Sequence, residues 1–333
     1  GGRMKRALYL MGSGTLSRRQ NTLCLEREGV KRYVPVEQVL EIHVFGEVDF
    51  NKRLLEFLSQ HEILVHIYSY HGWYMGTFYP REHNNSGYLI LQQAVHYLDP
   101  EKRMDLARRF VYGAIQNLLH VLRYYQRRGK QLEDITATVE GHLNRVWDQK
   151  GIEQLMQVEG QAREAYYRAF DRILEDPDFE FEERSRRPPR NRMNALLSFG
   201  NSLLYTTVLS EIYRTHLDPR IGFLHATNFR RFALNLDVAE VFKPVLVDRM
   251  ILSVIQKGQI QAKHFDSSLG GLYLKEEGRR RFLEAWEERL STTIQHRGLK
   301  RQVSYRTLVR LELYKLEKHL IGDREYRPFR TRW

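Results

Sequence analysis

Residues 63–87 read ILVHIY, SYHG, WYMGTFYP and REHNNSG, and they mark the point at which the chain changes its hydrophobic period. The two apolar runs, 63–68 and 73–79, are short and rich in β-branched and aromatic residues, which is typical of strands. Gly72 lies between them and favours a tight hairpin turn. The polar segment 81–87 that follows predicts a linker.

The chain before this stretch also has the pattern of strands. Short β-rich runs fill residues 5–45, with turn-like glycines between them, and one helical stripe covers residues 51–60. We therefore expect a small, β-sandwich-like N-terminal domain at residues 1–80, followed by the linker at 81–87.

The chain after the linker has a helical period. Apolar residues recur at three-and-four spacing in segments 104–119, 151–175, 193–216, 237–257, 279–294 and 303–320. This pattern predicts an all-α domain at residues 88–333, so the expected fold class is α+β.

The charge balance points to a polyanionic partner. The 333 residues include 53 Lys and Arg against 41 Asp and Glu, a net charge of +12. Such a surplus favours nucleic acid, because each phosphate that is neutralised releases a condensed counterion. An anionic membrane surface is the other common partner.

The remaining bulk features favour a soluble, cytoplasmic protein. Cys24 has no second cysteine to pair with, which favours a reducing compartment. No apolar run reaches the ~18 residues that span a bilayer. No signal-peptide pattern is present at the start, where residues 1–3 precede Met4 and resemble the remnant of a tag.

A basic segment lies between two predicted helices. Arginines crowd residues 184–192, and Pro188 and Pro189 prevent a helix from running through them. A solvated loop is the ordinary interpretation of such a run. Because this one opens onto a helix near the candidate site, we expect its arginines to contact DNA phosphates, in particular Arg186, Arg187 and Arg190.

Two helical segments and one loop carry the candidate chemistry. The stripe at 151–175 places Glu159 on a face with small and aromatic residues, where a buried carboxylate needs Arg163 or a cation as its partner. His225 ends an apolar turn, and alone it would be a structural histidine. Asp237 and Glu240 lie three residues apart on one helix face, where like charges repel unless a cation lies near them.

These side chains form a mixed set of oxygen and nitrogen donors. Such a set suits Mg²⁺ or Mn²⁺. The sequence has no Cys/His cluster for structural zinc, no phosphate-binding GxxxxGK loop and no GxSxG nucleophile elbow. A carboxylate-rich metal site in a basic protein indicates phosphodiester chemistry.

At these segments the chain resembles the CRISPR-associated adaptation integrases, the Cas1 family, and in particular its type I-B-like members. The resemblance extends over nearly the whole chain, and its specificity comes from the order of the segments. They are residues 8–10, 72–81, 159–160, 186–189, 194–200, 222–225, 237–240, 304–306 and 326–329.

The resemblance implies roles for individual residues. Glu159, His225 and Glu240 match the three metal-binding catalytic positions of the family. Asp237 matches an acidic position beside them, to which we assign a supporting role. Lys243 follows the acidic pair and matches a basic position suited to a DNA phosphate.

One position departs from the family pattern. Asn201 stands where many relatives carry Tyr, so no role is transferred to it. The resemblance also implies a homodimer formed through the β domain, a Cas2 dimer as partner, and a Cas4 nuclease as a further partner. It implies a metal-dependent DNA integrase and endonuclease that joins the 3′-hydroxyl ends of prespacer DNA to a CRISPR repeat. A plain metal-dependent nuclease acting on branched DNA and a non-catalytic nucleic-acid scaffold are the alternatives.

Overall fold

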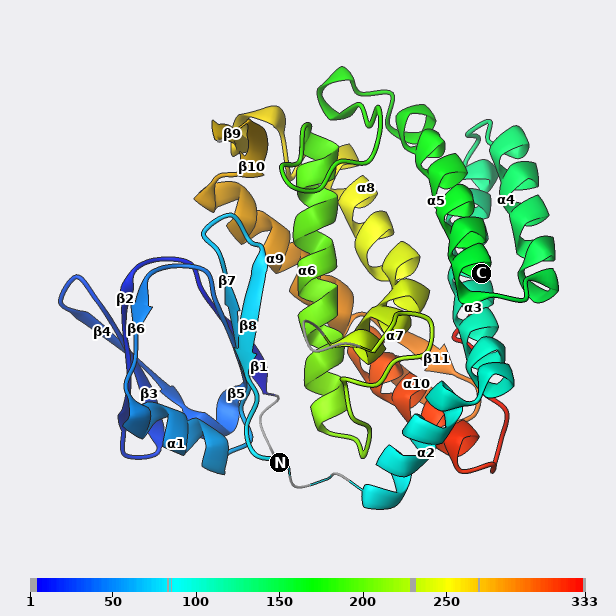
Figure 1. Cartoon of the computed structure of the whole chain (residues 1–333). Coiled ribbons are helices and arrows are strands. Elements are labelled where there is room, and N and C mark those ends of the chain that lie inside the picture. The colour runs from blue at the N-terminus through cyan, green and yellow to red at the C-terminus, as the bar shows by residue number, and fades with distance from the viewer. Residues whose placement is uncertain (1–4, 83, 85, 228–231, 269, 332–333) are drawn as a thin grey trace. The chain divides into compact units, whose positions relative to one another are not determined.

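A computed structural model of the protein describes residues 5–82, 84, 86–227, 232–268 and 270–331. The chain divides into two compact units, residues 1–83 and 84–333 (Figure 1). The division falls in the polar segment after residue 80. The fold is α+β, with a strand-rich N-terminal unit and a mostly helical C-terminal unit.

The N-terminal unit contains two four-stranded sheets. One has the strand order β1-β5-β7-β8 and the other β4-β3-β2-β6. The first sheet is mixed, because β1, β5 and β7 run parallel and β8 returns antiparallel to β7. The bounds are β1 (Arg6–Leu10), β2 (Gly14–Arg19), β3 (Thr22–Arg27), β4 (Val30–Pro35), β5 (Val39–Val44), β6 (Val48–Asp49), α1 (Lys52–Gln60), β7 (Val65–Tyr68) and β8 (Tyr74–Phe78).

Helix α1 helps to close the core of this unit. Its first turn is capped by Asn51, whose side chain accepts a hydrogen bond from the backbone N–H of Leu54 at 3.0 Å. Phe57 of α1 packs in one apolar cluster with Ile42 and Val44 of β5. The strands expected in residues 5–45 and 63–79 and the helix expected at 51–60 are therefore confirmed, whereas β2 and β6 were not predicted.

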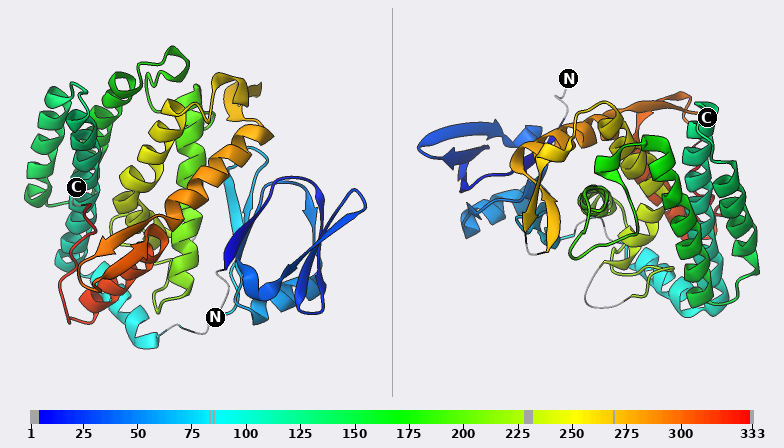
Figure 2. Two further views of the ribbon diagram at one scale, coloured as in Figure 1. Left: turned by 180° about the vertical axis from the view of Figure 1, so that it is seen from behind. Right: turned by 90° about the horizontal axis from the view of Figure 1, so that it is seen from above.

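The C-terminal unit consists mainly of helices (Figures 1 and 2). Their bounds are α2 (Gly87–Leu98), α3 (Pro100–Arg127), α4 (Glu133–Arg145), α5 (Ile152–Leu174), α6 (Arg192–Tyr213), α7 (Ala233–Lys243), α8 (Arg249–Gln256), α9 (Glu276–Ser291) and α10 (Tyr305–Leu320). Short 3₁₀ turns also occur in both units: η1 (Val36–Gln38), η2 (Val146–Asp148), η3 (Pro177–Phe179) and η5 (Ala262–His264).

Helix α6 is buried along most of its length, which Figure 2 (right) shows nearly end-on. Its apolar residues are distributed around the whole circumference rather than along one stripe, as expected for a helix inside a protein. Among the described residues, none of the helices combines the length and apolarity needed to cross a bilayer.

The prediction that this unit is all-α is wrong in two places. Two antiparallel hairpins interrupt the helices, β9 (Phe265–Ser268) with β10 (Gly271–Leu274), and β11 (Thr293–His296) with β12 (Arg301–Ser304). The predicted stripes at 279–294 and 303–320 ran into the second hairpin. Strands of four residues are too short to show a clear two-residue period beside long helices.

The disturbance expected at Lys243 and Pro244 is a change of helix type. A π-helical turn, η4 (Pro244–Asp248), connects α7 to α8 without breaking the path of the chain. Proline removes one backbone hydrogen bond of a helix, and a wider turn is one way to accommodate that change.

Candidate functional site

Helix α5 carries Glu159 on its buried face. Leu155, Ala162 and Tyr166 are buried at the helical spacing that places them beside Glu159, which is itself only 8% exposed. A carboxylate in this setting needs a partner. Arg163, one turn later, donates from Nε to Glu159 Oε1 at 3.1 Å.

Arg163 also joins α5 to α7. Its Nη2 atom forms an ion pair with Oε2 of Glu240, which lies 77 residues further along the chain. The guanidinium group therefore lies between two carboxylates from two helices. Of the two partners that the sequence allowed for Glu159, the structure contains Arg163.

His225 is held by Asp237. The carboxylate of Asp237 is fully buried and accepts hydrogen bonds from the backbone N–H groups of residues 223–225, at 2.6, 3.1 and 2.9 Å. The same carboxylate lies 2.7 Å from Nδ1 of His225. Asp237 thus shapes the loop and orients the imidazole, which leaves Nε2 of His225 as the nitrogen that can bind a ligand.

Gly222 allows this loop to pass close to α7. A Cβ atom at Gly222 would lie 2.8 Å from the Cβ of Ala233, the first residue of that helix. Only a residue without a side chain fits at this distance. The tight turn that the sequence predicted before His225 therefore has a steric cause.

The two glutamates carry different charges. Burial raises the pKa of Glu159 to about 7, and the negative charge of Glu240 adds to the rise. Burial has the same effect on Glu240, but Arg163 and Lys243 outweigh it and lower its pKa to about 2. One acid is therefore ionised at neutral pH while the other titrates near it, as in other close carboxylate pairs.

His225 lies within electrostatic reach of both acids. Burial by itself lowers its pKa, but the hydrogen bond with Asp237 and the charges of Asp237, Glu240 and Glu159 raise it overall. The structure thus brings together all four residues that the sequence predicted for the site.

One further polar residue of the site was missed by the sequence analysis. Asp248 is fully buried and accepts a hydrogen bond from the hydroxyl of Tyr166 at 2.8 Å. Its Oδ1 atom has no hydrogen-bond partner among the described residues, and burial raises its pKa to about 6. The available signal was the Pro244 turn, which places Asp248 in the same charge network as Lys243 and Arg163.

Lys243 faces this network rather than an open surface. It is largely buried, its ammonium nitrogen lies 5.7 Å from the ring centre of Tyr167, and its charge lowers the pKa of both Glu240 and Asp248. A phosphate would have to enter the site to reach it, so the DNA contact of Lys243 stays a prediction.

The arginines of segment 184–192 have two kinds of surroundings. Arg184 is structural, because its guanidinium binds the side chains of Asn194 and Ser198 at 2.7 and 3.2 Å. Arg186, Arg187 and Arg190 are exposed. Their predicted contact with DNA phosphates is not tested by the structure.

The donor atoms of the site are of the types that bind a divalent metal ion, but their positions in the structure do not converge on one. Among the described residues, no group of three or more Asp, Glu, His or Cys side chains converges on a possible ion position. At this site the guanidinium of Arg163 occupies the space between Glu159 and Glu240, and its buried Nη1 atom has no hydrogen-bond partner there. Two carboxylates and the free nitrogen of His225 suit Mg²⁺ or Mn²⁺, provided that Arg163 moves aside.

Comparison with known proteins gives one consistent family. The family model described as CRISPR associated protein Cas1 matches residues 8–288. The chain is 54% identical over 330 residues to the CRISPR-associated endonuclease Cas1 2 of Thermodesulfovibrio yellowstonii, covering 99% of this chain and 100% of that one. A solved CAS1 protein from Thermotoga maritima has a TM-score of 0.88 at 50% identity, covering 96% and 98% of the two chains.

More distant structures share the fold alone. A casposase bound to its integration product has a TM-score of 0.86 at 21% identity, covering 97% of this chain and 92% of that one. A chain of a Cas6-RT-Cas1–Cas2 complex has a TM-score of 0.87 at 20% identity, covering all of this chain and 37% of that one.

Proposed function

The chain belongs to the Cas1 family of CRISPR-associated proteins, and from that premise we propose that it is a metal-dependent DNA integrase and endonuclease of spacer acquisition. Relatives at this level of identity are named CRISPR-associated endonucleases. The fold shared with a casposase bound to its integration product is consistent with an integrase. The type I-B subtype stays a prediction.

One observation of the structure carries the proposal. Glu159 and Glu240, from two helices far apart in the chain, are bridged by a single cation, with the imidazole of His225 close enough to influence both. Burying two carboxylates together is costly, and a purely structural core gains nothing from it. A site that exchanges the guanidinium for a divalent ion and a phosphate explains the arrangement.

The residues of the chain have distinct roles in this proposal. Glu159, Glu240 and Nε2 of His225 would hold the ion, and Asp237 would keep Nδ1 of His225 engaged so that Nε2 faces it. When bound, Mg²⁺ or Mn²⁺ would supply Lewis-acid stabilisation of the charge that develops on the scissile phosphate. Lys243, beside the same carboxylates, would attract the phosphate into the site.

The reaction is a phosphodiester exchange. The 3′-hydroxyl of the incoming prespacer DNA attacks a phosphorus atom at the boundary of the CRISPR repeat, and a new phosphorus–oxygen bond forms. The bond to the 3′-oxygen of the repeat strand breaks, and that oxygen takes up a proton. Water in place of the hydroxyl gives hydrolysis, so the nuclease and integrase activities use one site.

The partners follow from the family. We propose a homodimer formed through the N-terminal unit and an assembly with a Cas2 dimer, consistent with the fold shared with a chain of a Cas6-RT-Cas1–Cas2 complex. A Cas4 nuclease that trims the incoming ends is a further proposed partner. Exposed Arg186, Arg187 and Arg190 would bind DNA phosphates and position the strand without reading its sequence.

Strand transfer tests the proposal directly. A labelled short duplex is incubated with a supercoiled plasmid bearing a repeat, with Mn²⁺ or with EDTA, and with or without the Cas2 partner. The proteins compared are the wild type, His225→Ala and the control His61→Ala, which removes an exposed histidine of the N-terminal unit. Joined product that needs Mn²⁺, disappears in His225→Ala and is retained in His61→Ala is the expected result.

The other outcomes separate the alternatives. Metal-dependent nicking without joined product, even with the partner present, would indicate a plain nuclease. DNA binding without chemistry in every protein and condition would indicate a non-catalytic scaffold.

A further inference from the structure

The C-terminal segment, residues 326–331, is anchored on α3. A Cβ atom at Gly113 would lie 2.4 Å from the Cβ of Pro328, so the segment passes directly over that glycine. Asn117 donates from Nδ2 to the carbonyl oxygen of Phe329 at 3.0 Å, and its Oδ1 accepts from the backbone N–H of Thr331 at 3.3 Å. The segment is therefore held in a defined position on the helical unit by packing and hydrogen bonds.

The anchoring turns two arginines outward. Tyr326, Phe329 and Thr331 are buried, whereas Arg327 and Arg330 between them are exposed. A segment that only closed the core would need the buried residues and not the charges. The outward arginines are the part of this motif that the catalytic site does not use.

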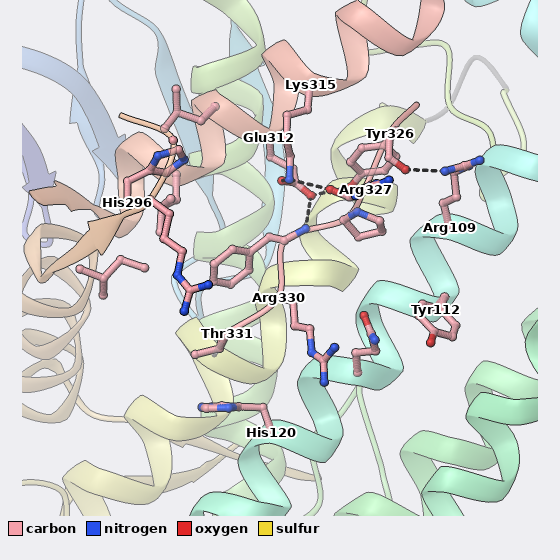
Figure 3. A pocket seen from close by; sticks show the side chains of 18 of the residues that line it. Arg109, Tyr112, His120, His296, Glu312, Lys315, Tyr326, Arg327, Arg330 and Thr331 are labelled. Atoms are coloured by element: carbon pink, nitrogen blue, oxygen red, sulfur yellow. Dashed lines mark hydrogen bonds and ion pairs between the residues drawn. The ribbon is translucent and has the colours of Figure 1, made fainter. Parts of the chain in front are cut away.

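These arginines line one side of a groove of about 1110 Å³ (Figure 3). The middle of α10, the β11–β12 hairpin and segment 326–331 line it together with one stripe of α3. That stripe consists of Arg109, Tyr112, Gln116, His120, Arg123 and Arg127. None of the lining residues belongs to the Glu159, His225 and Glu240 site.

The groove carries uncompensated positive charge. The guanidinium groups of Arg127, Arg297, Arg327 and Arg330 are exposed, and none forms an ion pair or a hydrogen bond with any residue that the structure describes. The one carboxylate of the described lining, Glu312, is buried and already accepts from the hydroxyl of Tyr326 and the backbone N–H of Phe329, at 2.6 and 2.7 Å (Figure 3).

Glu312 also pairs with Lys315 at 2.6 Å. Its charge therefore secures the C-terminal segment and Lys315, and it leaves the free arginines uncompensated. A ligand of opposite charge is the missing counterpart.

His120 lies in the groove, where burial and the positive charges around it lower its pKa. It is more than nine-tenths buried, and its Nε2 atom has no hydrogen-bond partner among the described residues. Burial, followed by the charges of Arg249, Arg127 and two other arginines, lowers its pKa to about 4. At neutral pH the imidazole is therefore uncharged and can donate or accept a hydrogen bond with a ligand.

We propose that this groove is a second nucleic-acid site, which binds the phosphate backbone of DNA away from the reacting phosphate. Guanidinium groups match phosphate oxygens in pairs, and four free ones along one groove suit a repeating polyanion better than a single small ligand. Trp147, 47% exposed, and Tyr112 lie with ring centres 5.8 Å apart at the groove and offer a surface for a sugar or base.

The choice of DNA as the polyanion rests on the proposed function, whereas the groove and its charges do not. An acidic segment of a partner protein has similar charge but lacks the flat bases that the aromatic pair suits. DNA affinity measured under conditions that prevent catalysis therefore tests the groove proposal independently of the proposed reaction.

The test is DNA affinity in EDTA, where no reaction occurs. One variant combines Arg127→Gln, Arg327→Gln and Arg330→Gln. The control combines Lys31→Gln, Arg168→Gln and Lys257→Gln, which removes the same charge from exposed positions outside the groove. A third protein combines Arg127→Lys, Arg327→Lys and Arg330→Lys, and thermal unfolding establishes that every variant is folded.

Binding of a short fluorescein-labelled duplex is measured by anisotropy over a range of salt concentrations. We expect the Gln groove variant to bind about 10-fold more weakly, and its plot of log affinity against log salt to flatten by about 0.9 for each phosphate that is no longer neutralised. The Lys variant should recover most of the affinity, since charge is retained, and the control should match the wild type.

Two results would overturn the proposal. Equal affinity and salt dependence in the groove and control variants would remove the groove from DNA binding. Unchanged duplex binding with weaker binding of poly-glutamate in the groove variant would assign the groove to an acidic protein segment instead. The wild type could give no joined product in strand transfer while the Gln groove variant still binds DNA more weakly than the wild type. That result would contradict the catalytic proposal and support the groove proposal.

Discussion

The carboxylate of Asp237 lies 2.7 Å from Nδ1 of His225 and also accepts hydrogen bonds from the backbone N–H groups of residues 223–225. One buried side chain thus determines both the path of the loop and the orientation of the imidazole that the loop carries. Because a carboxylate has enough lone pairs for all four contacts, no water or second residue is needed. This geometry makes Asp237 a supporting residue whose removal should be visible in stability.

Asp237→Ala should lower the free energy of unfolding by about 3 kcal/mol, because it leaves buried N–H groups without an acceptor. Urea unfolding in EDTA measures this change without any contribution from metal. Asp266→Ala is the control, since that carboxylate is 72% exposed. A decrease no larger than that of the control would mean that the loop is held by other contacts.

Arg163→Met should destabilise the metal-free protein by about 3–5 kcal/mol, because Glu159 and Glu240 lose the cation between them. If a divalent ion uses the same space, Mn²⁺ should raise the unfolding temperature of this variant more than that of the wild type. Differential scanning calorimetry with Mn²⁺ and with EDTA measures both effects.

The matched control for that experiment is Arg168→Met on the same helix, whose side chain is 66% exposed. It should respond to Mn²⁺ as the wild type does. If Mn²⁺ raises the unfolding temperatures of Arg163→Met and Arg168→Met equally, the ion does not use the space that the guanidinium of Arg163 occupies.

Glu159→Gln should change how stability depends on pH. The pKa of Glu159 is about 7 in the folded protein against 4.5 for the ordinary side chain. Between these values the folded state binds more protons than the unfolded state, so the free energy of unfolding falls as pH rises through this window. The glutamine variant does not titrate, and its stability should fall less steeply from pH 4.5 to 7.

Urea unfolding at a series of pH values in EDTA measures this slope. Glu240 contributes outside the window, because its lowered pKa of about 2 adds stability that is lost as pH falls from 4.5 toward 2. Glu164→Gln on the same helix, 75% exposed, is the control. Identical slopes for Glu159→Gln and the wild type would show that Glu159 titrates normally.

Gly113→Ala and Gly141→Ala should have opposite effects. The new methyl group at Gly113 would meet Pro328 and displace the C-terminal segment, at a cost of about 1–3 kcal/mol. At Gly141, in helix α4, nothing lies within 4 Å of the added atom, so the better helix former should stabilise by up to about 1 kcal/mol. Thermal unfolding compares them, and a neutral Gly113→Ala would mean that the segment moves aside freely.

Much of the architecture was predictable because secondary structure follows local patterns. The apolar, β-branched run at residues 63–68 reflects a strand that is buried on both faces, and the stripe in residues 151–175 reflects one buried face of a helix. Both elements occur where the patterns place them. The strands at 293–296 and 301–304 were missed, because four residues give too little pattern to compete with adjacent helical stripes.

The candidate site was predictable in its members but not in its contacts. Glu159 and Arg163 are one helical turn apart, so their pairing could be foreseen from spacing alone. The second contact of Arg163, with Glu240, could not, because nothing in either helix states which other helix it packs against. Asp248 was missed for the same reason, since its partner Tyr166 lies 82 residues away.

The division into a strand-rich and a helical part, the positive charge and the family of the ordered motifs could all be read from the chain before folding, because they depend on composition and local order. The position of Arg163 between the two glutamates and the contact of Asp237 with His225 emerge only in the folded protein. Folding also brings Arg327 and Arg330 beside α3, where they line one groove together. Such contacts join segments that are distant in the chain, and burial, which selects their partners, exists only after the chain has folded.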